Sequence, residues 1–157
     1  MSEHEYDLVV VGAGPAGSSA AYAAAKNGIK VALLEKEENV AQTVRTSGVT
    51  WIDYAKEFGI PEDCYNPIKT YNFCSPNNKA SISDKKAKAA VLDVRKTYRF
   101  LAEQAKNNGA KIFVNTNVTE VIMVDGRPDV FPSWIRLDIS AWKKPGTNWS
   151  WNRKARI

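Results

Sequence analysis

The sequence has few of the residues that build disulfides, metal sites or histidine-based catalytic centres. It holds two cysteines, Cys64 and Cys74, whose separation fits neither a CxxC motif nor a metal site. We therefore expect free thiols in a reducing cytoplasm and no metal ion. The one histidine, His4, lies in a terminal segment of the kind that usually frays, and we assign it no catalytic role.

Long apolar runs are also missing. The first ten residues carry acids rather than a basic segment, and glycines interrupt the apolar run that follows well before it could span a bilayer. With 44% hydrophobic and 25% charged residues, the composition is that of a soluble globular protein of about one domain. The expectation is a cytoplasmic protein without a signal peptide or membrane span, able to associate with a membrane surface.

Acidic residues are scarce at the C-terminal end. Residues 134–157 carry six Lys and Arg against one Asp, which accounts for the whole net charge of +5, and they hold four of the five tryptophans. A basic tail can touch acidic lipid or nucleic acid. A solvated tail is the simpler interpretation, and no specific nucleic-acid partner is expected.

The N-terminal part has the pattern of a βαβ unit. Tyr6 to Val11 is a short apolar run rich in β-branched residues, which is typical of a strand buried on both faces of a parallel sheet. Pro15 to Asn27 is dense in alanine and predicts a helix, with Gly28 as its stop. Lys30 to Glu35 predicts the second strand.

The following residues predict further elements of an α/β domain. A polar loop is expected over 42–50, and the other elements are a short helix over 51–58, a hairpin of strands 68–74 and 79–83, a helix over 93–107, and strands over 111–114 and 118–124. We therefore predict the N-terminal portion of an α/β, Rossmann-like FAD/NAD(P)-binding domain over residues 5–126. It carries a β-hairpin insertion and is followed by an irregular, basic, Trp-rich tail over 127–157.

A glycine loop lies between the first strand and the first helix. Gly12, Gly14 and Gly17 form GxGxxG, with Ala13, Pro15 and Ala16 between them. The first glycine allows a tight turn, the second lets a pyrophosphate approach the backbone, and the third lets helix and strand pack closely. The loop predicts a dinucleotide site at the helix N-terminus; the alternative is a glycine-rich turn of no function.

Glu35 ends the second strand, 23 residues after Gly12, and Lys36 follows it. A carboxylate at this point can accept hydrogen bonds from both ribose hydroxyls of an adenosine, and it would repel a 2′-phosphate. The alternative is a surface glutamate. Because FAD and NAD share this fingerprint, the βαβ unit leaves the choice between them open.

The loop, the strand end "LLEK" and the later stretch "VLDVRKTYRFLAEQAKNNGAKI" together resemble the geranylgeranyl reductase family. That family belongs to the FAD-dependent enzymes with a p-hydroxybenzoate hydroxylase-like fold, and the resemblance covers residues 5 to 126. It favours FAD over NAD. It also implies that the complete enzyme reduces C=C bonds of isoprenoid lipid chains, or a related small-molecule substrate, with hydride from the flavin. A flavin monooxygenase of the same fold, or a non-catalytic dinucleotide-binding module, is the alternative.

The resemblance also implies further cofactor contacts. Arg45 in "VRTSG" and Arg95 in "LDVRK" match arginines that lie against the flavin cofactor, and Val118 matches a strand residue whose backbone meets the adenine. Guanidinium groups suit such a role because they bind phosphate bidentately. The alternatives are a solvated loop charge at Arg45, a helix-end charge at Arg95 and an ordinary core valine at Val118.

Two departures from the family weaken the match. Prenyl-reducing members often carry a cysteine after the loop arginine, where this chain has Thr46, Ser47 and Gly48. The later "GD" segment and the substrate domain of the family are missing. We expect a truncated or frame-disrupted copy whose family-like sequence ends near Gly126, and we assign no catalytic residue.

Overall fold

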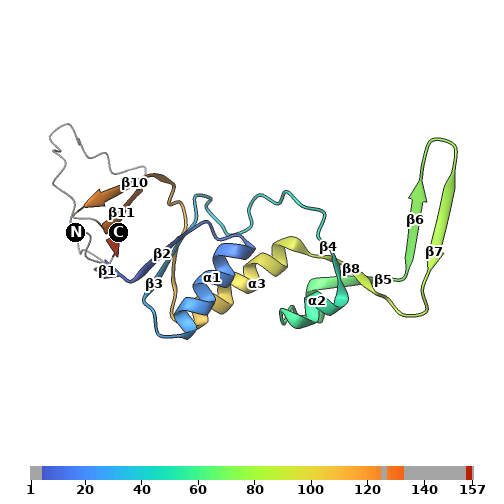
Figure 1. The fold of residues 1–157 in the computed structure, drawn as a ribbon, viewed down its shortest axis with the longest axis horizontal. Coiled ribbons are helices and arrows are strands. Elements are labelled where there is room, and N and C mark those ends of the chain that lie inside the picture. Colours follow the sequence, from blue (N-terminus) through green and yellow to red (C-terminus); the bar gives the residue numbers. More distant parts are fainter. Residues whose placement is uncertain (1–4, 125–126, 133–154, 157) are drawn as a thin grey trace. The chain divides into compact units, whose positions relative to one another are not determined.

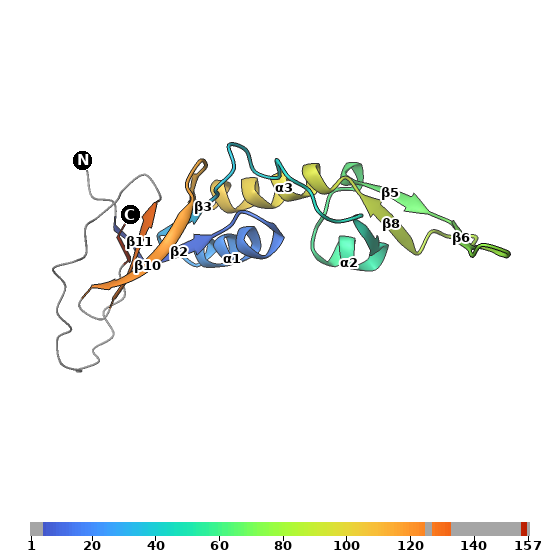
Figure 2. The ribbon, with the colours of Figure 1, turned by 90° about the horizontal axis from the view of Figure 1, so that it is seen from above.

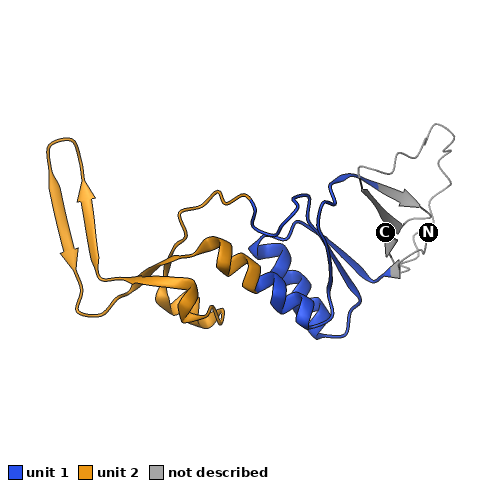
Figure 3. Cartoon of the chain, turned by 180° about the vertical axis from the view of Figure 1, so that it is seen from behind, with its two compact units in different colours: residues 1–42, 101–157 blue, residues 43–100 orange. Residues whose placement is uncertain are grey.

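The computed structural model describes residues 5–124, 127–132 and 155–156. The chain divides into two compact units, one of residues 1–42 with 101–157 and one of residues 43–100, coloured separately in Figure 3. Each unit contains its own sheets.

The first unit is built on a parallel three-stranded sheet. Strands β2 (Leu8–Val11), β3 (Val31–Leu34) and β9 (Lys111–Phe113) lie in the order β2-β3-β9. Helix α1 (Pro15–Lys26) connects β2 to β3 and lies beside them (Figures 1 and 2). The predicted βαβ unit and the α/β fold class are therefore confirmed.

The two faces of this sheet bury alternate side chains of β3. Val31 and Leu33 pack into a cluster with alanines of α1 and of α3 (Val94–Asn107). Ala32 and Leu34 pack on the other face with Tyr6. All four β3 residues are fully buried, as expected of a strand covered on both faces.

The predicted first strand is divided in two. The N–H groups of Asp7 and Leu8 both donate to the carbonyl of Lys30, at 2.9 and 3.3 Å. Strand β2 begins at Leu8, within this irregularity. The residues before it form β1 (Glu5–Tyr6), which pairs antiparallel with β12 (Ala155–Arg156). A doubled hydrogen bond of this kind leaves no trace in the hydrophobic pattern, so the sequence predicted one strand.

The second unit contains an antiparallel sheet that the sequence did not predict. Its strands β4 (Val49–Trp51), β8 (Ala89–Leu92) and β5 (Tyr65–Ile68) lie in the order β4-β8-β5. The loop expected over 42–50 thus ends in β4. Strands of three or four residues are too short for a recognisable alternation, and only their mutual pairing defines them.

The helices and the hairpin of the second unit match the prediction more closely. Helix α2 (Ile52–Glu57) lies within the expected helix and is followed by the short 3-10 helix η1 (Glu62–Cys64). Strands β6 (Thr70–Cys74) and β7 (Lys79–Ser83) form the expected hairpin. In its turn, the N–H of Ser75 donates to the carbonyl of Asn78 at 2.8 Å.

A second hairpin continues the first unit. Strand β10 (Val118–Val124) pairs antiparallel with β11 (Arg127–Pro132), on either side of the predicted turn at residues 125–126, which lie outside the described residues. Strand β11 was not predicted, because two prolines and an aspartate in "RPDVFP" argue against a strand. The predicted irregular tail therefore begins with a strand, and its tryptophans lie outside the described residues.

Candidate functional site

The glycine loop joins the carboxyl end of β2 to the N-terminus of α1. The N–H of Gly12 continues the sheet by donating to the carbonyl of Leu34 at 2.7 Å, and Gly12 turns the chain with a φ of +94°. Gly14 is then the N-cap of α1, and Pro15 is its first residue. Proline suits that position because its missing N–H would have no partner within the helix.

The other two glycines have different surroundings. A Cβ on Gly17 would lie 1.9 Å from the carbonyl oxygen of Gly12, so only glycine lets the helix pack this close to the strand end. A Cβ on Gly14 would meet nothing within 4 Å. The N-terminus of α1 therefore faces open space at Gly14, where the helix dipole and unpaired N–H groups favour an anion.

Ser18 supports the loop from inside, a role that the sequence analysis missed. Its side chain is fully buried, and its hydroxyl donates to the carbonyl oxygen of Ala13 at 3.1 Å. This bond ties the first turn of α1 to the loop. The signal that the sequence offered was a serine near the start of an alanine-rich helix.

Glu35 is held beside the loop by two backbone donors. Its Oε2 accepts the N–H of Ala13 at 2.8 Å, and its Oε1 accepts the N–H of Glu37 at 3.0 Å. The carboxylate is thus fixed next to the glycine loop, at the carboxyl end of β3. The side chain is half-buried, and the following residue, Lys36, is exposed.

The segment before β10 is bound to the same end of the sheet. The backbone N–H of Glu35 donates to Phe113 and its carbonyl accepts the N–H of Thr116, both at 2.8 Å. Val118 follows two residues later and packs against the cluster that contains Leu34. The structure therefore brings three segments together in the first unit: the glycine loop, Glu35 and the approach to Val118.

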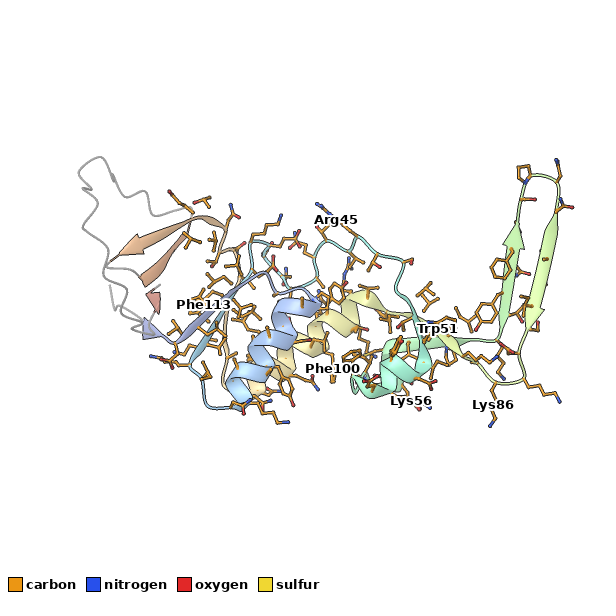
Figure 4. All side chains as sticks on the ribbon, in the orientation of Figure 1. Arg45, Trp51, Lys56, Lys86, Phe100 and Phe113 are labelled. Atoms are coloured by element: carbon orange, nitrogen blue, oxygen red, sulfur yellow. The ribbon has the colours of Figure 1, made fainter. Side chains whose placement is uncertain are left out.

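Arg45 and Arg95 belong to the second unit and are not part of this group. Arg45 is exposed in the loop before β4, where Figure 4 labels it. Arg95 is also exposed and is the second residue of α3. The carboxylate of Asp93 accepts the N–H of Lys96 at 3.0 Å and caps this helix.

An ion pair fixes the turn that carries Arg95. The ammonium of Lys96 donates to Oδ2 of Asp63 at 2.6 Å and to the carbonyl of Asp63 at 3.0 Å, which ties η1 to α3. The hydrogen bond to Lys96 lowers the pKa of the Asp63 carboxyl and raises that of Lys96. Burial raises the pKa of the neighbouring Cys64 thiol, so this cysteine is a poor nucleophile.

The described part of the chain lacks two features that would point to other functions. Within it, no helix is long and apolar enough to cross a membrane. Nor do these residues contain a group of three or more His, Cys, Asp or Glu side chains that could hold a metal ion.

A parallel sheet with a glycine loop on the first helix and an acid at the end of the second strand defines a dinucleotide-binding α/β protein. The comparison with known families narrows this class. The family of FAD dependent oxidoreductases matches residues 7–139, and the chain belongs to it. The match runs thirteen residues beyond Gly126.

Several relatives carry a more specific name. A digeranylgeranylglycerophospholipid reductase of Methanocaldococcus jannaschii is 41% identical over 115 residues, which cover 71% of this chain and 29% of the relative. The enzyme of the same name from Methanococcus vannielii is 35% identical, with 82% of this chain and 34% of the relative covered. The chain thus spans about a third of the length of these reductases.

A solved structure agrees with these relatives. A geranylgeranyl bacteriochlorophyll reductase-like protein of Thermoplasma acidophilum aligns with a TM-score of 0.68 at 29% identity, over 78% of this chain and 33% of the other. The resemblance to geranylgeranyl reductases seen in the sequence is confirmed, and it applies to the FAD-binding N-terminal part of those proteins.

Proposed function

We propose that the first unit binds the ADP half of FAD. The pyrophosphate lies against Gly14, Pro15 and Ala16 at the N-terminus of α1, where the space is open and the helix dipole is favourable. Gly12, Ala13 and Gly17 shape the turn. The observation that carries the proposal is the open space at Gly14 beside a fixed Glu35 carboxylate.

The hydrogen bonds of Glu35 support its role toward the ribose. A carboxylate has about four lone-pair sites. Two are used by the N–H groups of Ala13 and Glu37, which fix the orientation of the group. The others can accept hydrogen bonds from the two ribose hydroxyls. We also assign contacts with the adenosine to Lys36 and to the backbone near Val118.

The wider function follows from the family. Bound FAD supplies hydride chemistry that the side chains described here do not possess. The names of the relatives favour the reduction of C=C bonds in the isoprenoid chains of a phospholipid by the complete enzyme. In that enzyme, Arg45 and Arg95 would bind the cofactor, because a guanidinium can donate two hydrogen bonds to a phosphate.

The test is a titration of the purified chain with FAD, followed by quenching of flavin fluorescence. Gly14→Asp should abolish binding, because its carboxylate would occupy the space of the pyrophosphate and would repel the negative charge of that group. Glu35→Ala should weaken binding by about 1–3 kcal/mol, the cost of unmade hydrogen bonds to a charged group. Glu35→Gln should lie between Glu35→Ala and the wild type.

Glu38→Ala is the matched control, since it removes an exposed acid three residues away. It should leave the affinity for FAD unchanged. Equal affinities of the wild type, Gly14→Asp and Glu35→Ala, with unfolding transitions showing that all are folded, would contradict the proposed cofactor site.

A further inference from the structure

The hairpin of β6 and β7 has two chemically different faces. In the pairing, Tyr71 lies opposite Ile82 and Phe73 lies opposite Ala80, so these four side chains share one face. The alternate pairs are polar: Thr70 with Ser83, Asn72 with Ser81, and Cys74 with Lys79. Hydrogen bonds tie the polar face together, from Ser81 Oγ to Asn72 Oδ1 at 2.6 Å and between the hydroxyls of Thr70 and Ser83 at 3.0 Å.

Three of the four side chains on the apolar face are exposed. Phe73 is 59% and Ile82 55% exposed, and Ala80 is exposed as well. Tyr71 fixes the base of the hairpin, since its hydroxyl donates to the carbonyl of Ile68 at 3.3 Å and accepts the N–H of Ala89 at 3.2 Å. Two-stranded hairpins are marginally stable without cover on their apolar face.

The same segment concentrates positive charge. Residues 69–88 contain five lysines and one aspartate, although residues 1–133 as a whole are neutral. All five lysines are exposed, and they are Lys69, Lys79, Lys85, Lys86 and Lys88. Lys88 pairs with Asp84 at 3.2 Å, and Lys86 follows β7 at the base of the hairpin (Figure 4).

We propose that this hairpin, residues 69–88, docks on the surface of an anionic phospholipid bilayer. Phe73 and Ile82 enter the interface between headgroups and acyl chains, which buries apolar area, and the lysines outside the two strands meet the lipid phosphates. Charge complementarity selects this partner, because five exposed lysines against one aspartate in residues 69–88 match the negative charge of lipid phosphates. The proposal is independent of the flavin site, and its test needs no cofactor.

The experiment is flotation of the purified chain with vesicles of phosphatidylcholine, alone or with about one third phosphatidylserine. The wild type should bind the anionic vesicles at least about tenfold more tightly than the neutral ones, and less tightly as salt rises. Phe73→Ser with Ile82→Ser, and separately Lys85→Ala with Lys86→Ala, should each weaken binding roughly tenfold or more.

Phe58→Ser is the matched control, because Phe58 is 70% exposed but lies outside the hairpin. It should bind like the wild type. Equal binding to both kinds of vesicle, or equal losses in Phe58→Ser and the hairpin variants, would overturn the proposal. A different outcome would also overturn it: the wild type forms a dimer, the double substitution Phe73→Ser and Ile82→Ser dissociates that dimer, and neither the wild type nor the double variant binds vesicles.

The cysteines provide a second readout that does not depend on substitutions. Cys74 is exposed at the end of β6, whereas Cys64 is buried, so a thiol-reactive environment-sensitive dye labels the hairpin selectively. Its emission should shift to the blue with anionic vesicles and not with neutral ones. An unchanged spectrum in the presence of bound vesicles would place the contact elsewhere and overturn the proposal.

Discussion

Tyr6 is a well-packed side chain that carries one unsatisfied polar group. The residue is 1% exposed and its ring meets that of Phe113 edge-on, with the centroids 6.0 Å apart. Its hydroxyl is buried without a hydrogen-bond partner in the described part of the chain. Burial raises the pKa of this hydroxyl because the phenolate would be desolvated.

Tyr6→Phe should therefore leave the free energy of unfolding unchanged or raise it by up to about 1 kcal/mol, because it removes only an unsatisfied group. Tyr6→Ala should lower it by about 3–5 kcal/mol through the cavity that it creates. Urea unfolding followed by circular dichroism measures both. A loss above about 1 kcal/mol in Tyr6→Phe would mean that the hydroxyl has a partner.

The proposed FAD contacts also include Arg45 and Arg95, which belong to the second unit. We predict that Arg45→Ala and Arg95→Ala each weaken FAD binding by about 1–3 kcal/mol, as expected for lost charge-assisted hydrogen bonds. Lys85→Ala and Lys86→Ala remove the same charge from the hairpin and should have no effect. The fluorescence titration measures all four. Similar losses at every position would show that overall charge, rather than defined contacts, governs binding.

At the scale of elements, the packing of α1 on β2 depends on Gly17. The Cβ of an alanine would meet the Gly12 carbonyl oxygen at 1.9 Å, and this contact is with backbone that cannot rotate away. The helix would have to move from the strand end, which would also disturb the neighbouring bond from Ser18 to Ala13.

Gly17→Ala should therefore lower the free energy of unfolding by about 3 kcal/mol, at the upper end of the usual cost of overpacking. Gly14→Ala is the matched change: its Cβ meets nothing, and its φ of −70° suits alanine. It should leave stability unchanged while reducing FAD affinity. Thermal unfolding of the pair tests this, and equal stabilities would contradict the close approach of helix and strand.

At the scale of the whole molecule, the chain of 157 residues spans about a third of the length of the reductases that it matches. The cofactor contacts that we propose for the first unit involve only the ADP half of FAD. We predict weak FAD binding and no reduction of a prenyl double bond by this chain, because orientation of substrate and flavin is the protein's contribution to such a reaction.

The assay uses the chain with FAD, dithionite as reductant and a geranylgeranyl lipid under anaerobic conditions, and follows product mass. No saturated product should form, and added ADP should displace FAD readily. Tight stoichiometric flavin together with saturated product would show that these 157 residues suffice for catalysis.

The sequence by itself determined the βαβ unit. Glycine spacing, the alanine-rich helix and Glu35 act locally, through turn geometry, helix propensity and the end of a strand, so the pattern predicted them. The β6–β7 hairpin was predictable for the same reason, since a short turn lies between two runs of extended residues.

Only the tertiary structure decided which distant segments meet. The β4-β8-β5 sheet joins residues up to about forty positions apart in strands of three or four residues, and β11 pairs despite its prolines. The two N–H groups that hold the Glu35 carboxylate, and the empty space at Gly14, likewise exist only after folding. Such features depend on pairing partners and on packing between segments, and no local pattern of residues encodes them.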